Sequence, residues 1–236
     1  METIYGQTLA SLVKENHQIV PVLEKYNLDF CCRGKRSLQE ACMEKGLEVK
    51  NVAAELEAVV LSPRTDRIPF EEMSAEQIIS HILVHHHFYV KQAMPLIYMH
   101  LEKVATKHGT HYPYMKQVFD LFSEIQDEMI SHMQKEETVL FPRIKELENL
   151  HLENSRTEFP ANYLKAPITV MENEHEHAGD ILFKIRELTN NYSTPADACT
   201  SFRVSLAELK EFEDDLHEHV HIENNILFPK AQQFSF

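Results

Sequence analysis

Apolar residues recur every three or four positions through most of the chain, which is the spacing of helices that bury one face. Almost no segment shows the strict alternation of a half-buried strand. The pattern therefore predicts an all-α protein. Four long helices are expected at about 74–107, 114–148, 167–190 and 196–230, preceded by shorter ones at about 9–26, 38–45 and 49–61.

A few residues predict where these helices begin, bend and end. Ser74 followed by Gln77 can form a capping box, in which each side chain bonds the backbone N–H of the other residue. Proline lacks an N–H, and its ring crowds the preceding turn, so we expect a kink at Pro95 unless a neighbour compensates, and a bend or break at Pro142. Residues 149–166 are predicted to be an irregular connection.

The chain divides into three parts by composition. Residues 1–62 predict a small N-terminal helical domain, with the segment Asn-Leu-Asp-Phe-Cys-Cys-Arg-Gly at 27–34 as a loop between its helices. Residues 63–73 contain two prolines and mixed charge, which is typical of a linker. Residues 74–236 predict an antiparallel four-helix bundle.

Charge and composition exclude several classes of protein. The chain has 236 residues, a formal net charge of -14 and only 5 glycines, and its Lys and Arg are scattered. Nucleic acid is therefore not an expected partner, because phosphate binding needs a concentrated basic surface. The first residues lack the pattern of a secretory signal, and no stretch has the roughly 18 apolar residues of a membrane span. We expect a cytoplasmic protein without a membrane partner, with its four cysteines mostly reduced.

An internal repeat is visible in the second and fourth long helices. The segment that begins with His132 and Glu136 resembles the one that begins with His219 and Glu223, and both end in Leu-Phe-Pro. The offset of 87 residues also superimposes the apolar faces that precede them, Phe119, Phe122, Ile125 and Met129 on Leu206, Leu209, Phe212 and Leu216. The His and Glu residues therefore continue the buried stripe of each helix.

The first and third long helices repeat in the same way. Aligning His87 with His175, an offset of 88 residues, superimposes Leu83, Val90, Met94 and Ile97 on Met171, Ala178, Leu182 and Ile185. Each of these helices thus carries a histidine within an apolar stripe. His86 lies close to the same stripe, so whether it replaces His87 stays open, although the repeat selects His87.

This set of residues predicts a metal centre. Residues four apart share a helix face, so each His-x-x-x-Glu pair offers one nitrogen and one carboxylate to the same interior point. Two buried carboxylates need compensating cations, and no Lys or Arg lies in these stripes near the site. The predicted ligands of two metal ions, held by four imidazoles and two bridging carboxylates, are His87, His132, Glu136, His175, His219 and Glu223.

The chemistry of the donors favours iron. Imidazole with carboxylate suits iron, manganese or zinc, and a six-ligand site within a helical bundle is a known setting for two irons. A lone histidine on an apolar face is more often a packed core residue. Two matching His-x-x-x-Glu pairs in matched stripes, with two further aligned histidines, are much harder to explain in that way.

Several residues next to the predicted ligands have open roles. Glu128, one turn before His132, and Glu174, directly before His175, could each accept a hydrogen bond from a ligand or remain solvated carboxylates. His81 and His85 could do the same or lie at the surface. His177, His217 and His221 point about 200° away from the ligands in a helix, so we expect them to face solvent. Cys42 and Cys199 show no motif and are expected in the core.

With these residues in hand, the chain resembles a known family. The pattern of His87, His132-x-x-x-Glu136, His175 and His219-x-x-x-Glu223 resembles that of hemerythrin-like bundles. The loop Asp-Phe-Cys-Cys-Arg-Gly resembles the double-cysteine motif of a small N-terminal domain. Together they resemble the RIC family (repair of iron centres, also called YtfE/ScdA) over nearly the whole chain.

The resemblance implies a function and roles for residues. It implies a stress protein that helps to restore iron–sulfur clusters damaged by nitric oxide or oxidants, with iron–sulfur proteins as clients and iron supplied from an oxo-bridged, non-haem di-iron centre. Glu136 and Glu223 would bridge the irons, and the four histidines would be terminal ligands. Cys31 and Cys32 would serve redox or partner contact. Three neighbouring basic residues would make these thiols more reactive, although cysteine often packs simply as a small apolar residue.

Other functions share the same ligands. A di-iron enzyme that reduces nitric oxide or peroxide would need the same bundle, so the chain could be an enzyme or a non-enzymatic iron donor. An oxygen or nitric oxide carrier or sensor would not require the cysteine loop. The N-terminal domain could also mediate homodimerisation.

Overall fold

The computed structural model describes residues 4–31, 33–60, 69–70, 72–155, 159–160 and 162–234. Within these ranges the regular elements are helical, and extended pairing is limited to an isolated bridge between Thr8 and Ser37. The prediction of an all-α fold is confirmed. Most of the linker predicted at 63–73 lies outside the described residues.

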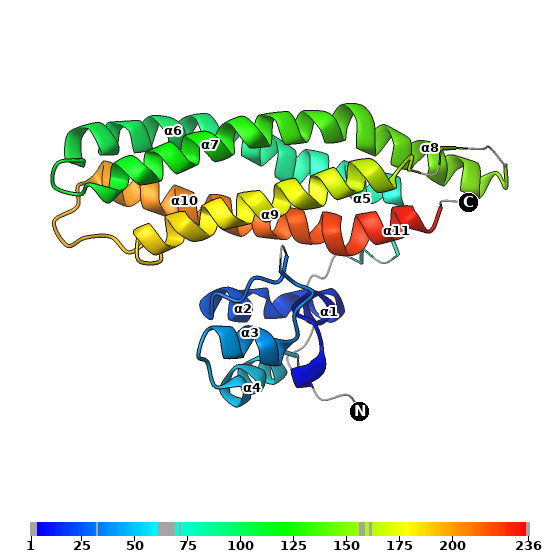
Figure 1. The fold of residues 1–236 in the computed structure, drawn as a ribbon, viewed down its shortest axis with the longest axis horizontal. Coiled ribbons are helices and arrows are strands. Elements are labelled where there is room, and N and C mark those ends of the chain that lie inside the picture. The colour runs from blue at the N-terminus through cyan, green and yellow to red at the C-terminus, as the bar shows by residue number, and fades with distance from the viewer. Residues whose placement is uncertain are drawn as a thin grey trace.

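The N-terminal part is a compact group of short helices below the bundle in Figure 1. Its elements are η1 (Ile4–Gly6), α1 (Leu9–Glu15), η2 (His17–Ile19), α2 (Val20–Lys25), α3 (Leu38–Glu44) and α4 (Val49–Val60). The prediction of one helix over 9–26 is wrong. Asn16 ends α1 in an extended conformation, and its Oδ1 accepts the N–H of Gln18 at 3.1 Å, which offers the backbone an alternative to the helix.

Four long rods lie side by side and form the bundle, with the N-terminal helices below α9 and α10 (Figure 1). The capping box of Ser74 and Gln77 is confirmed. The rods are built from α5 (Ala75–His81), η3 (Ile82–His87), α6 (Phe88–His108), α7 (Tyr114–Lys135), η4 (Glu136–Leu140), α8 (Phe141–Leu152), α9 (Lys165–Leu188), α10 (Thr200–Ile222), η5 (Glu223–Leu227) and α11 (Phe228–Gln232).

Three of the rods contain a wide π-helical turn, which the sequence did not predict. In η4 the N–H of Phe141 donates to the carbonyl oxygen of Glu136, five residues back, and in η5 Phe228 does the same with Glu223. Near Pro142, where we expect a bend or break, the α-helical pattern is interrupted by the π turn η4, which leaves this proline in the first turn of α8. Helix α6 continues through Pro95.

The apolar core consists of two clusters with a polar layer between them. The first cluster fills the N-terminal domain and the half of the bundle that contains the turn between α6 and α7, and the second cluster packs α5, α8 and α11 together. Along the second rod, the first cluster ends at Met133 of α7, and the second begins at Leu140, the last residue of η4. The buried His and Glu residues lie in the interval between these clusters.

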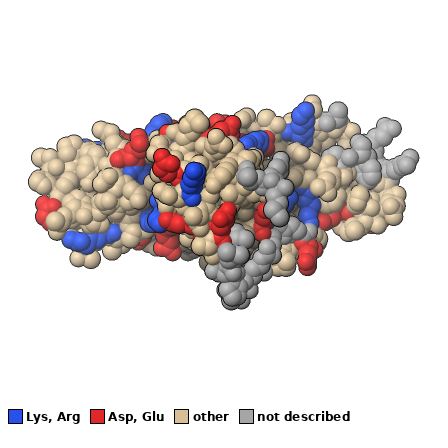
Figure 2. Space-filling model, turned by 90° about the horizontal axis from the view of Figure 1, so that it is seen from below, with Lys and Arg blue, Asp and Glu red and all other residues tan. Residues whose placement is uncertain are grey.

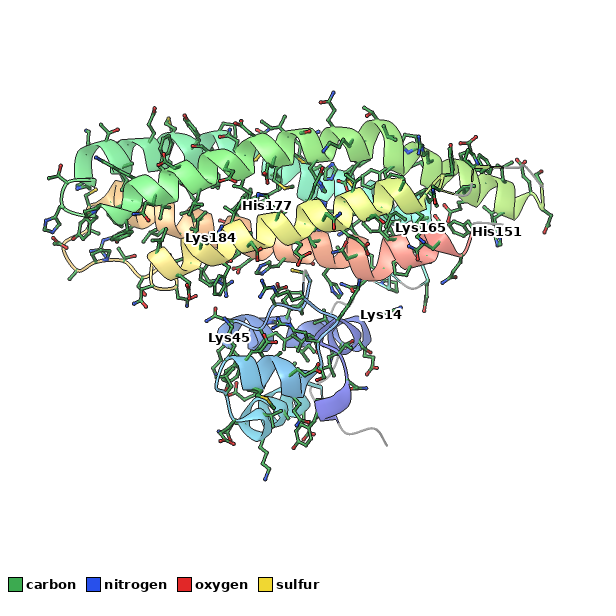
Figure 3. All side chains as sticks on the ribbon, in the orientation of Figure 1. Lys14, Lys45, His151, Lys165, His177 and Lys184 are labelled. Atoms are coloured by element: carbon green, nitrogen blue, oxygen red, sulfur yellow. The ribbon has the colours of Figure 1, made fainter. Side chains whose placement is uncertain are left out.

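Two polar contacts and one cation–π contact link the N-terminal part to α9. Arg33 pairs with Asp180 at 2.9 Å, and Arg186 donates to Asn27. Lys45 lies 4.7 Å from the ring centre of Phe183, on the side of the N-terminal part that faces the bundle (Figure 3). Acidic and basic side chains are interspersed on the face seen from below (Figure 2).

The last long helix differs from its predicted start. It begins at Thr200 instead of 196, and Cys199 is the preceding N-cap residue. The expectation that Cys199 lies in the core is therefore wrong: it is exposed, and its Sγ lies 3.3 Å from Nε2 of His108. Cys42 is buried, as expected. Within the described ranges no helix is long and apolar enough to cross a membrane.

Candidate metal centre

All six residues that the sequence selected as ligands converge in the polar layer, and each is at most 2% exposed. Glu136 and Glu223 are the first residues of the π turns η4 and η5. His87 is the last residue of η3, whereas His175 sits in the regular helix α9. The π turns let successive residues shift in register, so that donors from four helices point at the same volume.

The six side chains form two overlapping sets of donors. His87 and His219 lie with Glu136 and Glu223 in one set, in which one donor atom of each residue lies within 4.8 Å of the others. His132 and His175 form the second set with the same two carboxylates. Each set therefore has two imidazoles of its own, and the carboxylates belong to both.

The donor atoms within the sets lie close together. Nε2 of His132 lies 3.0 Å from Nε2 of His175 and 3.4 Å from Oε2 of Glu136. Nε2 of His219 lies 3.1 Å from Oε1 of Glu223. Yet both oxygens of Glu136 and of Glu223 are buried without a hydrogen-bond partner in the described part of the chain. Orphaned donor atoms that converge in this way are what a metal ion satisfies.

The two buried carboxylates have pKa values shifted in opposite directions. Burial and the charge of Glu223 raise the pKa of Glu136 well above its usual range. Burial also opposes the ionisation of Glu223, but the imidazoles of His219 and His175 hold its pKa well below the usual range. Bound cations would favour the charged form of both carboxylates.

The outward nitrogens of three ligands are held by residues around the centre. Nδ1 of His132 lies 2.9 Å from Oε2 of Glu174. Nδ1 of His87 lies 2.7 Å from Oε1 of Glu137, and Nδ1 of His175 lies 2.9 Å from Oδ1 of Asn224. Such bonds fix the tautomer and direct Nε2 towards the centre of the site.

Sequence reasoning missed Glu137 and Asn224, although a signal was present. Each directly follows one of the two carboxylates, Glu136 and Glu223, so they occupy the same position of the repeat. In the structure each supports the histidine of the partner helix in its own hairpin. The repeat therefore extends to the groups that orient the ligands.

Glu174 and Glu128 differ in position. Glu174 contacts His132 and also pairs with Lys135, and these groups lower its pKa to about 2. Glu128 instead pairs with His177 on the outside of α7 and α9, at 3.1 Å. Figure 3 shows His177 on α9 beside α7, and it is exposed as expected. With Glu124 these two residues form a third, solvent-facing group of potential donors.

His86 lies beside the centre but outside both donor sets. Its ring stacks on that of His219 at 5.4 Å with an interplanar angle of 6°, and its Nδ1 lies 3.0 Å from Oδ1 of Asp215. His87 is the residue whose Nε2 approaches Glu136, at 3.2 Å. The geometry thus favours His87 over His86 as a donor to the centre.

The expectation that His217 and His221 face solvent is wrong. They are 9% and 1% exposed. Their direction on α10 was expected correctly, but the loop of the N-terminal domain covers that face. Phe30 packs edge-on against both rings, at 6.1 Å and 5.7 Å between ring centres. A periodicity argument on α10 alone could not include this cover.

The double-cysteine loop is only partly described. Cys31 is 4% exposed, and its N–H and Sγ both donate to Oδ1 of Asp29, at 3.1 Å and 3.2 Å. Cys32 lies outside the described residues. Gly34 is required for the loop to close, because a Cβ there would lie 2.0 Å from the carbonyl oxygen of Phe30.

Comparison with known proteins agrees with this geometry. Residues 78–231 match the model of the hemerythrin HHE cation binding domain, the class of protein that the bundle and its buried donors define. Residues 5–60 match a model described as a domain of unknown function, DUF542, or ScdA_N.

Several curated relatives match this chain over nearly its whole length. The iron-sulfur cluster repair protein YtfE of Enterobacter sp. (strain 638) is 33% identical over 225 residues, which is 95% of this chain and 96% of the relative. The protein of the same name from Cronobacter sakazakii is 34% identical, and that from Shigella boydii 32%, over the same shares. The chain belongs to this YtfE family of hemerythrin-type proteins.

Proposed function

We propose that the chain holds two irons at the buried centre and takes part in the repair of damaged iron–sulfur clusters by donating iron. The observation that carries the proposal is the pair of donor sets that share Glu136 and Glu223. Two imidazoles per iron and two shared carboxylates suit a non-haem di-iron site, with room in the coordination shell for an oxo bridge.

The number and charge of the donors suit a pair of iron ions. Four imidazoles contribute neutral nitrogen donors, and the two carboxylates contribute two negative charges to balance the cations. Outward bonds from His87, His132 and His175 orient three of the imidazoles in advance. The bound irons would supply the redox and ligand-binding chemistry, while these residues bind, orient and release them.

Relatives whose match covers 95% of the chain are named iron-sulfur cluster repair proteins, which supports the same role here. Cluster-containing proteins are then the clients, and nitric oxide or oxygen are small ligands of the centre. We place this role in the cytoplasm, under nitrosative or oxidative stress. Cys31 and Cys32 would assist in contact with the client or in redox chemistry.

The experiment has two stages. Metal analysis of protein purified without oxygen should give about two irons per chain, the number that the paired donor sets require. The loaded protein is then mixed with an apo iron–sulfur protein, sulfide and a thiol reductant, and cluster formation is followed by its visible absorption. Transfer of iron to the client supports donation.

Two results would contradict the proposal. No iron, or a single zinc, would remove the di-iron premise. Two irons that do not reach the client, together with rapid consumption of nitric oxide or peroxide, would make the chain a di-iron reductase.

A further inference from the structure

A cavity of about 820 Å³ opens beside the centre, between α2 of the N-terminal part and helices α6 and α10 of the bundle. Its wall includes His81, His85, His86, Glu211, Asp215 and Glu218. None of these residues belongs to the two donor sets of the centre.

The wall of the cavity has more acidic than basic residues. Its basic residues are Lys25, Arg186 and Lys210, and two of them pair with carboxylates of the same wall, Arg186 with Glu213 and Lys210 with Asp214. The wall also contains Glu211, Asp215 and Glu218, beside the three histidines. Such a wall attracts cations and repels anions.

The three imidazoles form an unbroken series from solvent to the centre. His85 is exposed, and its ring lies 4.3 Å from that of His81. The ring of His81 lies 5.7 Å from that of His86, which in turn stacks on His219 at 5.4 Å. Exposure falls along the series, and the last member is 3% exposed.

At the inner end of this series, His86 and Asp215 have donor atoms without partners within the described ranges. Its Nδ1 is engaged by Asp215, but its Nε2 is buried without a hydrogen-bond partner in the described chain, as is Oδ2 of Asp215. A buried imidazole nitrogen and a carboxylate oxygen that lack partners are the donors that a borderline divalent cation prefers.

The repeat makes this position informative. His86 precedes His87 as Glu174 precedes His175, so the two residues are equivalent in the two hairpins. Glu174 bonds Nδ1 of a ligand, His132, and thereby fixes it. His86 makes no such bond with its neighbouring ligand, and Nδ1 of His219 has no partner in the described chain. At this repeat position, Glu174 thus fixes a histidine of one half of the centre, whereas His86 beside the other half lines the cavity.

We propose that His85, His81 and His86 form a route along which divalent iron passes between the cavity and the buried centre, an inference that rests on the iron-donating function. Asp215 and Glu218 contribute carboxylates along the route. An uncharged ligand such as nitric oxide would need neither the acidic wall nor the nitrogen donors.

The protonation of His81 agrees with this role. Burial and the neighbouring imidazoles of His85 and His86 lower the pKa of His81 to about 4. Its ring is therefore neutral at pH 7 and keeps a nitrogen lone pair for metal.

The test compares rates of iron transfer at unchanged occupancy. A His81→Phe/His85→Gln variant keeps an aromatic ring against Phe70, 5.1 Å away, and changes only an exposed residue besides. Full-length protein, loaded with iron, is mixed with a ferrous chelator, and the chelate absorption is followed. Reloading of apo protein with Fe²⁺ is measured in the same way. The matched control is His177→Gln, which alters the exposed group on α7 and α9.

We expect both rates to fall by roughly tenfold or more in the double variant, the order of effect of residues that support metal sites, with iron per chain at the wild-type value. Unchanged rates in the double variant would overturn the route. So would a slower rate in the control alone, which would assign transfer to the α7/α9 surface. These results leave the di-iron centre itself intact, whereas a wild-type chain that binds no iron overturns the proposed function as well.

A second readout detects the ion on the route. Iron-loaded wild-type protein is titrated with Co²⁺, whose visible absorption reports imidazole and carboxylate ligands. An additional Co²⁺ per chain that disappears in the double variant but not in His177→Gln supports the inference. Equal Co²⁺ binding in all three proteins contradicts it.

Discussion

The two halves of the metal centre have matching ligands but different surroundings. In the half of His132 and His175, both outward nitrogens are held, by Glu174 and Asn224. In the half of His87 and His219, only His87 has such a partner within the described ranges, Glu137. An internal repeat therefore preserved the donors while the layer around them diverged. The difference indicates that the histidines of the two halves are oriented to different degrees by their surroundings.

Replacing either shared carboxylate should have the largest effect, and it should affect the two halves alike. Since Glu136 and Glu223 belong to both donor sets, Glu136→Ala or Glu223→Ala should lower the metal content of both halves together. The helical fold should largely remain. Iron analysis with far-ultraviolet circular dichroism measures both quantities. Full iron occupancy and an unchanged near-ultraviolet spectrum in both variants would refute the ligand assignment.

The contact of the N-terminal part with the bundle should show the next effect. Arg186 and Glu213 are 12% and 2% exposed and lie 2.7 Å apart, and Arg186 also reaches Asn27. Arg186→Met would leave a buried carboxylate unpaired, which costs about 3–5 kcal/mol of unfolding free energy. Denaturant unfolding measures it. The double variant Arg186→Met/Glu213→Leu should recover much of the loss, and a double variant as unstable as the single one would refute this explanation.

Replacing the residue next to a ligand should weaken iron retention more in one half of the centre than in the other. Glu174→Ala removes the acceptor for His132 and should weaken iron retention by about 10–100-fold, as loss of such partners does at metal sites. His86→Phe keeps a ring on His219 without breaking a bond to any ligand, so its effect on retention should be smaller. Competition with a chelator of known affinity gives both values at equilibrium. Equal losses would mean that the halves are equivalent.

Replacing Glu128 should have the smallest effect on stability and iron retention. It lies one turn from His132, but its pair with His177 is exposed on both sides. Glu128→Ala should change the unfolding free energy by no more than about 0.5 kcal/mol and leave iron retention unchanged. Thermal unfolding and iron analysis check this. A loss of iron comparable to that of Glu174→Ala would show that Glu128 reaches the centre.

Local sequence determined the helices and the donors of the centre. Apolar periodicity and the offsets of 87 and 88 residues identified the six converging residues, because residues four apart on a helix share a face whatever surrounds it. The same logic identified Glu174, directly before His175, as one of two candidates for support. It did not distinguish Glu174 from Glu128, since both lie within one turn of a ligand.

Tertiary structure alone decided the rest. His217 and His221 are buried because Phe30, almost two hundred residues earlier in the chain, packs on their face of α10. The sequence predicts a bend or break at Pro142, but it does not predict that the interruption is a π turn whose first residue is the buried Glu136. The acidic cavity at His86 exists only where α2 approaches α6 and α10. Such features depend on contacts between distant segments, and local periodicity carries no information about them.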